Sequence, residues 1–212
     1  MSLFLGKIHF WLFNKVLWFE GLEDEIIKLA QEEGLNVKKL SVEINNKYGQ
    51  KTENKNLEEI IDTSNIHGWL QNKIHSAEGR MAAWTSAILN NDKEYIYELK
   101  KIYTEQGVNA AREAKVKSSN VTAEDIFNSM NDYILDGMPC DRVNEVITSN
   151  NEIIEWKRRI CVHKEIWENE GVPVEIFYEL RNQWISSFVK EMNNDYEYIE
   201  LDNDIKAIRK RS

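Results

Sequence analysis

The stretch "RVNEVITSNNEIIEWKRRICVH" (residues 142–163) decides the fold class, because the helical patterning of the preceding chain ends there. It is rich in β-branched residues and carries a Ser-Asn-Asn turn signal at its centre. This pattern favours an antiparallel hairpin in which residues 142–148 pair with residues 152–162. One face of the second strand would then carry Ile154, Trp156, Ile160 and Val162, with Arg158 as the polar exception.

A helix is the alternative for the same residues. Apolar or aromatic side chains recur three and four apart in the series Ile153, Trp156, Ile160, His163 and Trp167. Periodicity leaves both readings open, and the β-branched content favours the hairpin. We therefore predict an α+β fold that is predominantly α-helical, with a small antiparallel sheet near the C-terminal end. An all-α bundle is the alternative.

Helices are predicted on the N-terminal side of this stretch. One long helix, or two joined near Gly21, is expected over 4–33, and a weaker one over 36–47. The clearest helix follows Ser64 or Asn65 and runs to about Ile88, because apolar residues recur there every three or four positions. Asp92 and Thr122 are typical caps for two more, which end near Lys117 and Gly137.

On the C-terminal side, Gly171 and Pro173 precede a predicted helix over 174–192, and "YEYIEL" (196–201) reads as a third short strand. The ending holds Lys206, Arg209, Lys210 and Arg211, and is predicted to be a frayed basic tail. We predict a single domain, 1–212. It would comprise a helical body (1–137), a hairpin-helix-strand region (138–201) and the tail (202–212).

Composition and charge narrow the functional classes. The net charge is −9, from 36 acidic and 27 basic residues, and an acidic surface disfavours nucleic acid as a partner. The apolar stretch 8–19 is interrupted by Asn14 and Lys15 and is too short to span a bilayer. With no signal-peptide pattern and two cysteines, a cytoplasmic protein with reduced thiols is expected.

Cys161 and His163 are the first candidate site. In a strand, residues i and i+2 point to the same face, so both side chains would line one pocket. A histidine beside a thiol favours the thiolate, which is the nucleophilic form. In a helix the two residues would point in different directions, and burial of the thiol in the core is the structural alternative.

A polar stripe on the clearest helix is the second candidate. His67, Gln71, His75 and Glu78 fall four, four and three residues apart, with Arg80 nearby. Facing inward, this stripe would bind an anionic ligand or a metal, and facing outward it is a solvated flank. The paired Glu-x-x-His elements of di-iron bundles are absent, so no metal and no cofactor is assigned.

The C-terminal third resembles a known family. A hairpin that ends at Ile160-Cys161-Val162-His163, an amphipathic helix, a break at Gly171-Val172-Pro173, another helix and a late strand follow in order. This layout is similar to the L-2-amino-thiazoline-4-carboxylic acid hydrolase-like family. The resemblance implies hydrolytic ring-opening of a small cyclic substrate, with Cys161 at the first cysteine position. Where the family has a second cysteine and an aspartate, residues 180–184 read "LRNQW", and the late cysteine is missing.

Two functional hypotheses follow. The first is a small-molecule pocket, which in its catalytic form belongs to a cysteine-dependent hydrolase acting on a C–N or C–S bond. Its lining would be Trp156, Cys161, His163, Trp184, His67, His75, Glu78 and Arg80. The second is a non-catalytic ligand-binding or dimerising protein. Its seam would be the aromatic N-terminal helix with Phe10, Trp11, Phe13, Trp18 and Phe19. The expected partners are an unknown small molecule and, for the seam, a second copy of the chain.

Overall fold

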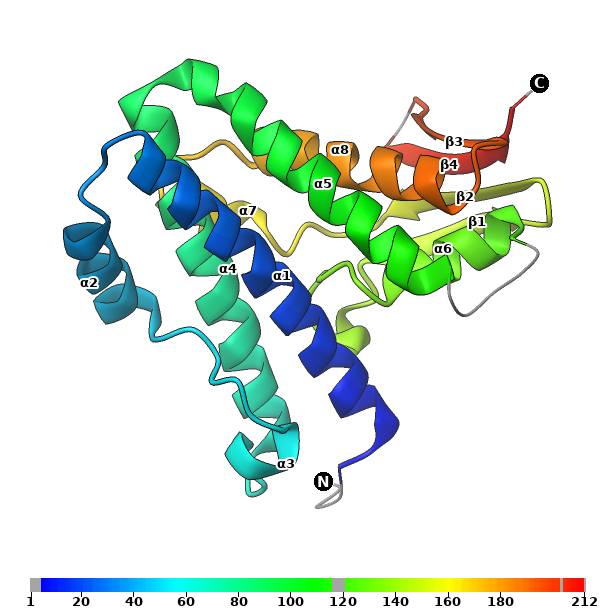
Figure 1. The fold of residues 1–212 in the computed structure, drawn as a ribbon. Coiled ribbons are helices and arrows are strands. Elements are labelled where there is room, and N and C mark those ends of the chain that lie inside the picture. Colours follow the sequence, from blue (N-terminus) through cyan, green and yellow to red (C-terminus); the bar gives the residue numbers. More distant parts are fainter. Residues whose placement is uncertain (1–4, 116–120, 203, 212) are drawn as a thin grey trace. The chain divides into compact units, whose positions relative to one another are not determined.

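A computed structural model of the chain describes residues 5–115, 121–202 and 204–211 (Figure 1). Its fold is α+β and mostly helical, with a small antiparallel sheet near the C-terminus, which confirms the predicted fold class. The chain divides into two compact units. Unit 1 comprises Met1–Ile96 and His163–Val174, and unit 2 comprises Tyr97–Val162 and Glu175–Ser212. Each unit is described by itself below.

Unit 1 is helical. Its elements are α1 (Lys7–Glu32), α2 (Val37–Tyr48), α3 (Leu57–Ile60), α4 (Ile66–Asn91), η1 (Lys93–Tyr95) and α7 (Lys164–Asn169). The predicted long helices are confirmed: α1 runs unbroken through Gly21, and the Asn65 side chain caps α4 by accepting a hydrogen bond from the Gly68 amide. Helix α4 packs against α1, α2 and α7 and is therefore the centre of this unit.

Unit 2 has helices on one side of its sheet. The helices are α5 (Ile96–Lys115), α6 (Ala123–Asn131), η2 (Pro139–Asp141) and α8 (Val174–Met192). The Thr122–Asp125 capping box starts α6 where the sequence placed it, but the helix ends at Asn131 rather than near Gly137. Helix α5 approaches α8 closely at Gly107, where an added Cβ would lie 2.4 Å from the Trp184 carbonyl oxygen.

The sheet contains β1 (Asn144–Ser149), β2 (Ile153–Arg158), β3 (Tyr196–Glu200) and β4 (Ile205–Lys210). Its order is β1-β2-β4-β3, and every neighbouring pair is antiparallel. The predicted hairpin and the predicted strand over 196–201 are confirmed. The helical alternative for residues 152–163 is wrong, because β1 and β4 both pair with β2.

The predicted frayed tail over 202–212 is wrong. Residues Ile205–Lys210 form β4, which lies between β2 and β3 and is hydrogen-bonded to both. Asp204, directly before β4, lies in the left-handed region at φ 61°, which aspartate tolerates better than most residues. The four basic residues of this segment led to the prediction of a tail, although Ala207 and Ile208 of the strand are fully buried.

The second hairpin strand is shorter than predicted. It ends at Arg158, so residues 159–162 are not in the sheet. On one side the partner chain bends away at Arg142, whose φ of 50° is left-handed, and on the other side β4 begins opposite Lys157. Residues 159–162 therefore have no strand to pair with on either edge.

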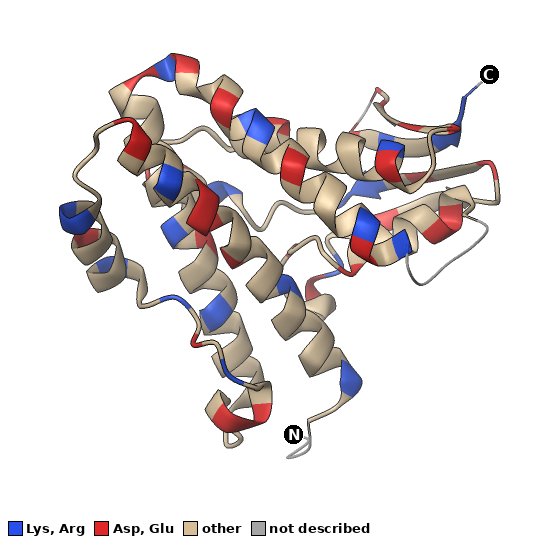
Figure 2. Cartoon of the chain, viewed as in Figure 1, with Lys and Arg blue, Asp and Glu red and all other residues tan. Residues whose placement is uncertain are grey.

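The predicted boundary at residue 137 does not coincide with the units, because most of α5 and all of α6 belong to unit 2 with the sheet. Figure 2 shows acidic and basic residues interspersed along the helices. Within the described residues, none of the helices combines the length and the apolar character needed to cross a bilayer.

Candidate functional site

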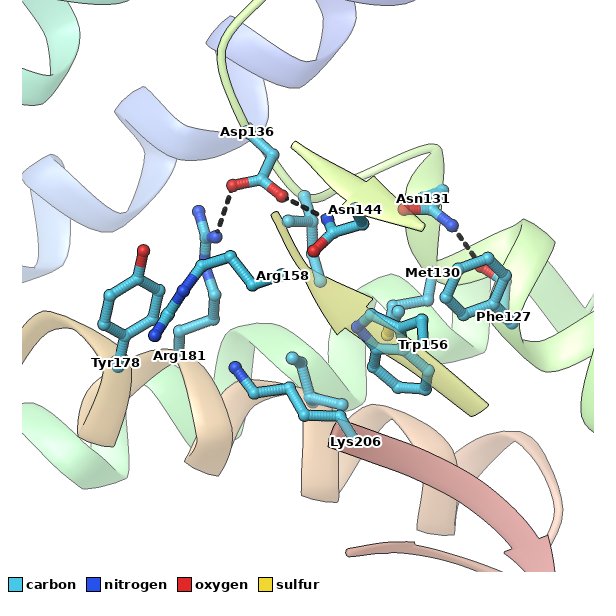
Figure 3. Close-up of a pocket in the computed structure, with 12 residues that line it drawn as sticks. Phe127, Met130, Asn131, Asp136, Asn144, Trp156, Arg158, Tyr178, Arg181 and Lys206 are labelled. Atoms are coloured by element: carbon cyan, nitrogen blue, oxygen red, sulfur yellow. Dashed lines mark hydrogen bonds and ion pairs between the residues drawn. The ribbon is translucent and has the colours of Figure 1, made fainter. Parts of the chain in front are cut away.

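Basic side chains gather on the helix-covered face of the unit 2 sheet (Figure 3). Trp156 and Arg158 are two residues apart on β2 and so share a face, and Lys206 on β4 pairs directly with Trp156. Helix α8 covers this face: the Arg158 guanidinium carbon lies 3.9 Å from the centre of the Tyr178 ring. One turn further along α8, Arg181 adds a third cation.

These side chains line a small cavity of about 30 Å³. By volume it holds about two water molecules, which is the size of a carboxylate or the oxygens of one phosphate. One wall is apolar and the other is polar. The full lining is Phe127, Met130, Asn131, Ile134, Asp136, Asn144, Trp156, Arg158, Tyr178, Arg181, Ile185 and Lys206.

Arg181 is held in place by neighbours. Its Nη1 donates to Asp136 Oδ1 at 2.8 Å, and its Nη2 donates to the Leu135 carbonyl oxygen at 2.5 Å. The other carboxylate oxygen of Asp136 accepts from Asn144 Nδ2 at 2.6 Å. The turn after α6 therefore supplies Asp136 as the partner of Arg181, and the guanidinium has a fixed orientation at the cavity.

Arg158 is only partly satisfied. Its Nη2 lies 3.4 Å from Asp204 Oδ1, a long contact to a side chain that is 67% exposed. Its Nη1 is buried and has no hydrogen-bond partner in the described part of the chain. A buried donor without a partner costs about 1–3 kcal/mol, more when it is charged, so this atom needs an acceptor that the described residues do not supply.

Lys206 is the most unusual residue of the site. It is 9% exposed, and its Nζ forms no hydrogen bond or ion pair with residues 5–115, 121–202 or 204–211. The amine lies 5.2 Å from the centre of the Tyr178 ring, and Figure 3 shows it pointing toward the Arg158 side chain. Two cationic groups thus approach the same space, with the carboxylates of Asp136 and Glu200 nearby.

The titration of these groups follows from their surroundings. Burial, and then the charges of Arg158 and Arg181, lower the pKa of Lys206 below its usual value, while Glu200 and Asp136 oppose the shift. Burial and a contact with Cys161 raise the pKa of Tyr178 above its usual value, so its hydroxyl keeps its proton. The cavity is therefore a cation-rich site with a neutral phenol at its side.

Of the residues predicted in unit 2, Trp156 lines this cavity. Trp184 does not: its Nε1 donates to Gln106 Oε1 at 3.0 Å, and its ring stacks on Phe188 at 5.1 Å. Cys161 is exposed, and its Sγ lies 3.1 Å from the Tyr178 hydroxyl oxygen. The thiol thus contacts a residue of the cavity lining.

His163 has a different environment from that of Cys161. It is 1% exposed, belongs to unit 1, and its Nδ1 lies 2.5 Å from Glu78 Oε1. The same Glu78 oxygen accepts a hydrogen bond from Trp167 Nε1 at 3.1 Å. Because β2 ends at Arg158, Cys161 and His163 do not share a strand face; their pairing as nucleophile and base stays a prediction.

The side chains of the predicted polar stripe on α4 lie in different environments. The exposed His67 ring lies 5.6 Å from the His9 ring, and the exposed His75 contacts Gln71 at 2.8 Å. Glu78 and Arg80 point into the core of unit 1 instead. These four residues have separate partners rather than one common ligand space.

Arg80 is a fully buried structural cation. Its Nε lies 3.0 Å from both Glu23 carboxylate oxygens and its Nη2 lies 2.5 Å from Glu20 Oε1. Its Nη1 contacts Ser76 Oγ at 2.6 Å and the carbonyl oxygens of residues 49 and 50. Each nitrogen of the guanidinium has at least one acceptor and the side chain is fully buried, so Arg80 serves the core of unit 1.

The aromatic N-terminal helix is largely covered inside unit 1. Phe13 and Phe19 are buried, whereas Phe10 is half-buried and lines an open groove with Leu17 and residues 54–59. The predicted dimer seam stays a prediction.

Sequence reasoning missed Arg181 and Lys206, and named Arg158 only as an exception. The signal for Arg158 was present, because a charged residue interrupted an otherwise apolar strand face. Lys206 carried a similar signal between Ile205 and Ile208, but the assignment of a frayed tail removed it from consideration. Arg181 became recognisable only once its partner Asp136 was placed.

Comparisons of the chain with protein-family models, curated proteins and solved structures found no match. The resemblance to the thiazoline hydrolase-like family therefore stays a prediction. In the described residues no three His, Cys, Asp or Glu side chains come together in a way that would hold a metal ion.

Proposed function

We propose that unit 2 binds a small molecule through its oxyanion group, a carboxylate or a phosphate, in the cavity between Arg158, Arg181 and Lys206. The observation that carries this proposal is Arg158 Nη1, a buried cationic donor without an acceptor in the described residues, which lines one cavity together with the largely buried side chain of Lys206. A charge held away from water without a partner is costly, and an anion at this position would satisfy both groups.

The cations have complementary roles. A guanidinium binds a carboxylate or phosphate through two parallel N–H donors, and a lysine ammonium acts as a point charge. Arg181 is fixed by Asp136 and supplies orientation, Arg158 supplies a buried donor that lacks an acceptor, and Lys206 supplies a second charge at the same cavity. A partly closed site of low dielectric strengthens each of these interactions compared with a surface lysine.

The remaining lining favours a small organic acid. The Trp156 indole, with Phe127 at a ring distance of 4.9 Å, offers an apolar wall beside the cations. Asn144 is exposed at the site, so the ligand enters next to the start of β1. A cavity of about 30 Å³ has room for the anionic group, and the rest of a small acid would extend toward the opening beside Asn144.

Calorimetric titration tests the proposal. Inorganic phosphate and pyruvate are titrated into the full chain at constant ionic strength, with chloride as the reference anion. We expect saturable binding of at least one of them, weakened about 10–100-fold in Lys206→Met and Arg158→Met, because each variant loses a charged hydrogen bond of about 1.5–3 kcal/mol.

The matched control is Lys157→Met. Lys157 is the neighbour of Arg158, is exposed, and points to the opposite sheet face. The Lys157→Met variant removes the same net charge as the two test variants but lies away from the cavity, so it should leave the affinity for the anion unchanged. Equal weakening in all three variants would mean that general surface charge attracts the anion, and no saturable heat with either anion would overturn the proposal.

The cysteine-dependent hydrolase remains the weaker hypothesis. The Cys161 thiol contacts the Tyr178 hydroxyl, which keeps its proton and does not act as a base near neutral pH. His163, the predicted base, contacts the buried carboxylate of Glu78. We therefore place the ligand at the three cations rather than at the thiol.

A further inference from the structure

We infer that Lys206 is a reactive amine that forms an imine with a small 2-oxo acid, whose carboxylate is held by Arg158 and Arg181. This inference rests on the proposed oxyanion site and names its substrate class. It starts from a geometric fact: a lysine amine in the described part of unit 2 reaches a small cavity, has no hydrogen-bond partner there, and lies beside two guanidinium groups.

The surroundings of Lys206 favour the neutral amine. On β2 the amine faces Arg158, and on α8 it faces Arg181 and Tyr178. Glu200 pairs with Lys206 across β3 and β4, and Asp136 lies on the turn after α6. Two of these carboxylates are otherwise engaged: Asp136 binds Arg181, and Glu200 accepts a hydrogen bond from Asn182 at 2.7 Å.

The neutral form of an amine is the nucleophile. Burial and the two arginines lower the pKa of Lys206, and each unit of lowering raises its neutral fraction at a given pH about 10-fold. A lysine that is desolvated or lies beside another cation is the usual form of a lysine that makes Schiff bases with carbonyl substrates. The arginines thus serve both as carboxylate ligands and as the cause of the reactivity.

The short distance between the carboxylate and the carbonyl group of a 2-oxo acid favours this substrate class. In such an acid the carbonyl carbon is directly bonded to the carboxylate carbon, so a carboxylate held by the guanidiniums brings the carbonyl next to the amine. The Trp156 wall then lies where a short alkyl group of the acid would extend.

The chemistry balances without a further reactant. The Lys206 nitrogen lone pair adds to the carbonyl carbon, the C=O π electrons move to oxygen, and a proton passes from nitrogen to oxygen to give a carbinolamine. Loss of that hydroxyl with a second nitrogen proton releases one water and leaves the C=N bond. Hydrolysis reverses the sequence, so the adduct is covalent but reversible.

Borohydride trapping tests the inference. The full chain is incubated with pyruvate near neutral pH, sodium borohydride is added as the reductant, and the product is analysed by intact mass and peptide mapping. We expect a gain of one pyruvate minus one water plus two hydrogens, located at Lys206, with at least about 10-fold more modification there than at any exposed lysine, following the lowered pKa.

Two variants and one ligand separate the outcomes. Lys206→Arg keeps the positive charge and should bind pyruvate while losing the adduct. Lys210→Arg changes an exposed residue of the same strand and should leave the adduct unchanged. Lactate, which lacks the carbonyl, should bind the wild-type chain and compete with trapping without forming an adduct.

Failure of this inference is distinguishable from failure of the proposed function. If pyruvate binds in calorimetry but no adduct forms at Lys206, or if adducts spread evenly over Lys157, Lys206 and Lys210, the imine is refuted and the oxyanion site stands. If neither pyruvate nor phosphate binds, both are refuted.

Discussion

The two units bury charge in opposite ways. In unit 1, Arg80 is 0% exposed and its guanidinium contacts two carboxylates, a hydroxyl and two carbonyl oxygens. In unit 2, Arg158 and Lys206 share a cavity, and one keeps a buried nitrogen without a partner while the other has no hydrogen bond to the described residues. Both clusters hold buried cations, but only the first is complete.

This difference distinguishes a buried charge cluster that stabilises the fold from one that can bind a ligand. A complete network such as that of Arg80 specifies one arrangement of its helices and has no capacity for a ligand. A cationic cluster in which a donor lacks an acceptor lowers the stability of the ligand-free protein. Binding of an anion that supplies the acceptor then raises the stability. By this criterion Arg80, which the sequence indicated as a ligand residue, is structural, and Lys206, which it assigned to a tail, belongs to the site.

The largest expected effect lies in the complete cluster. Arg80→Met leaves Glu20 and Glu23 buried without their cation, and we expect a loss of about 3–5 kcal/mol in the free energy of unfolding of unit 1. Urea denaturation monitored by helical circular dichroism measures it. The control Lys28→Met removes an exposed pair with Glu25 and should leave the free energy of unfolding nearly unchanged. Equal small losses would mean that the Arg80 network contributes little.

The stability deficit of Arg80→Met should depend on pH. Burial raises the pKa of Glu23 even with Arg80 present, so loss of the cation should raise it further. A carboxyl whose folded pKa is above its unfolded pKa contributes stability at low pH and loses it as pH rises through the folded value. The deficit of the variant should therefore shrink on moving from pH 7 to pH 5, and a deficit that does not change with pH would contradict this account.

The next effect has the opposite sign. Lys206→Met replaces an unpaired amine with an apolar side chain of similar length, so the empty protein should gain about 1–2 kcal/mol in the free energy of unfolding. The gain should be full below the lowered pKa of Lys206, where the folded protein also carries the charge, and should fade as the pH rises from that value to the usual lysine pKa. Denaturation at pH 7 measures it, and a loss of stability would show that the amine is satisfied.

Ligand binding should respond to pH through the same group. An oxyanion favours protonated Lys206, so binding of phosphate above the lowered pKa should take up protons, and the affinity should fall as pH rises through that range. Calorimetry in buffers of different ionisation enthalpy detects the uptake. Lys206→Arg should abolish this uptake while keeping the affinity, and an unchanged uptake would assign it to another residue.

The smallest effect is expected at the edge of the cavity. Asp204→Asn removes a long contact to Arg158 at 3.4 Å from a side chain that is 67% exposed, and asparagine also tolerates the left-handed backbone at this position. Stability should change by less than about 0.5 kcal/mol. The affinity for an oxyanion should rise slightly, since Arg158 loses a competing carboxylate, and a clear fall in calorimetric affinity would show that Asp204 orients Arg158.

Much of the fold was predictable because local signals were strong. Asn65 and Thr122 cap helices where predicted, and the turn centred on residues 149–151 joins two paired strands. The end of β2 was not predictable from its own residues, because it depends on where both neighbouring strands bend away. The apolar alternation continues past Arg158, but strand pairing requires partners as well as pattern.

The site was predictable only in part. Trp156 was found because a large aromatic on a predicted strand face is easily recognised, and Arg158 was visible as a charge among apolar residues. Arg181 and Lys206 reach the cavity from α8 and β4, and their approach to β2 is set by tertiary packing alone. Spacing placed Cys161 beside His163, but each side chain has its own partner elsewhere.

The central claim is that Arg158 and Lys206 meet at one cavity because they bind an oxyanion. It is tested most directly by measuring the free energy of unfolding of the wild type and of Lys206→Met, each in chloride and in saturating phosphate or pyruvate at equal ionic strength. We predict that the variant is the more stable protein in chloride, and that only the wild type gains when the oxyanion is added, by about 1.4 kcal/mol or more at ten times its dissociation constant. A variant that is less stable in chloride and gains as much as the wild type would contradict the account.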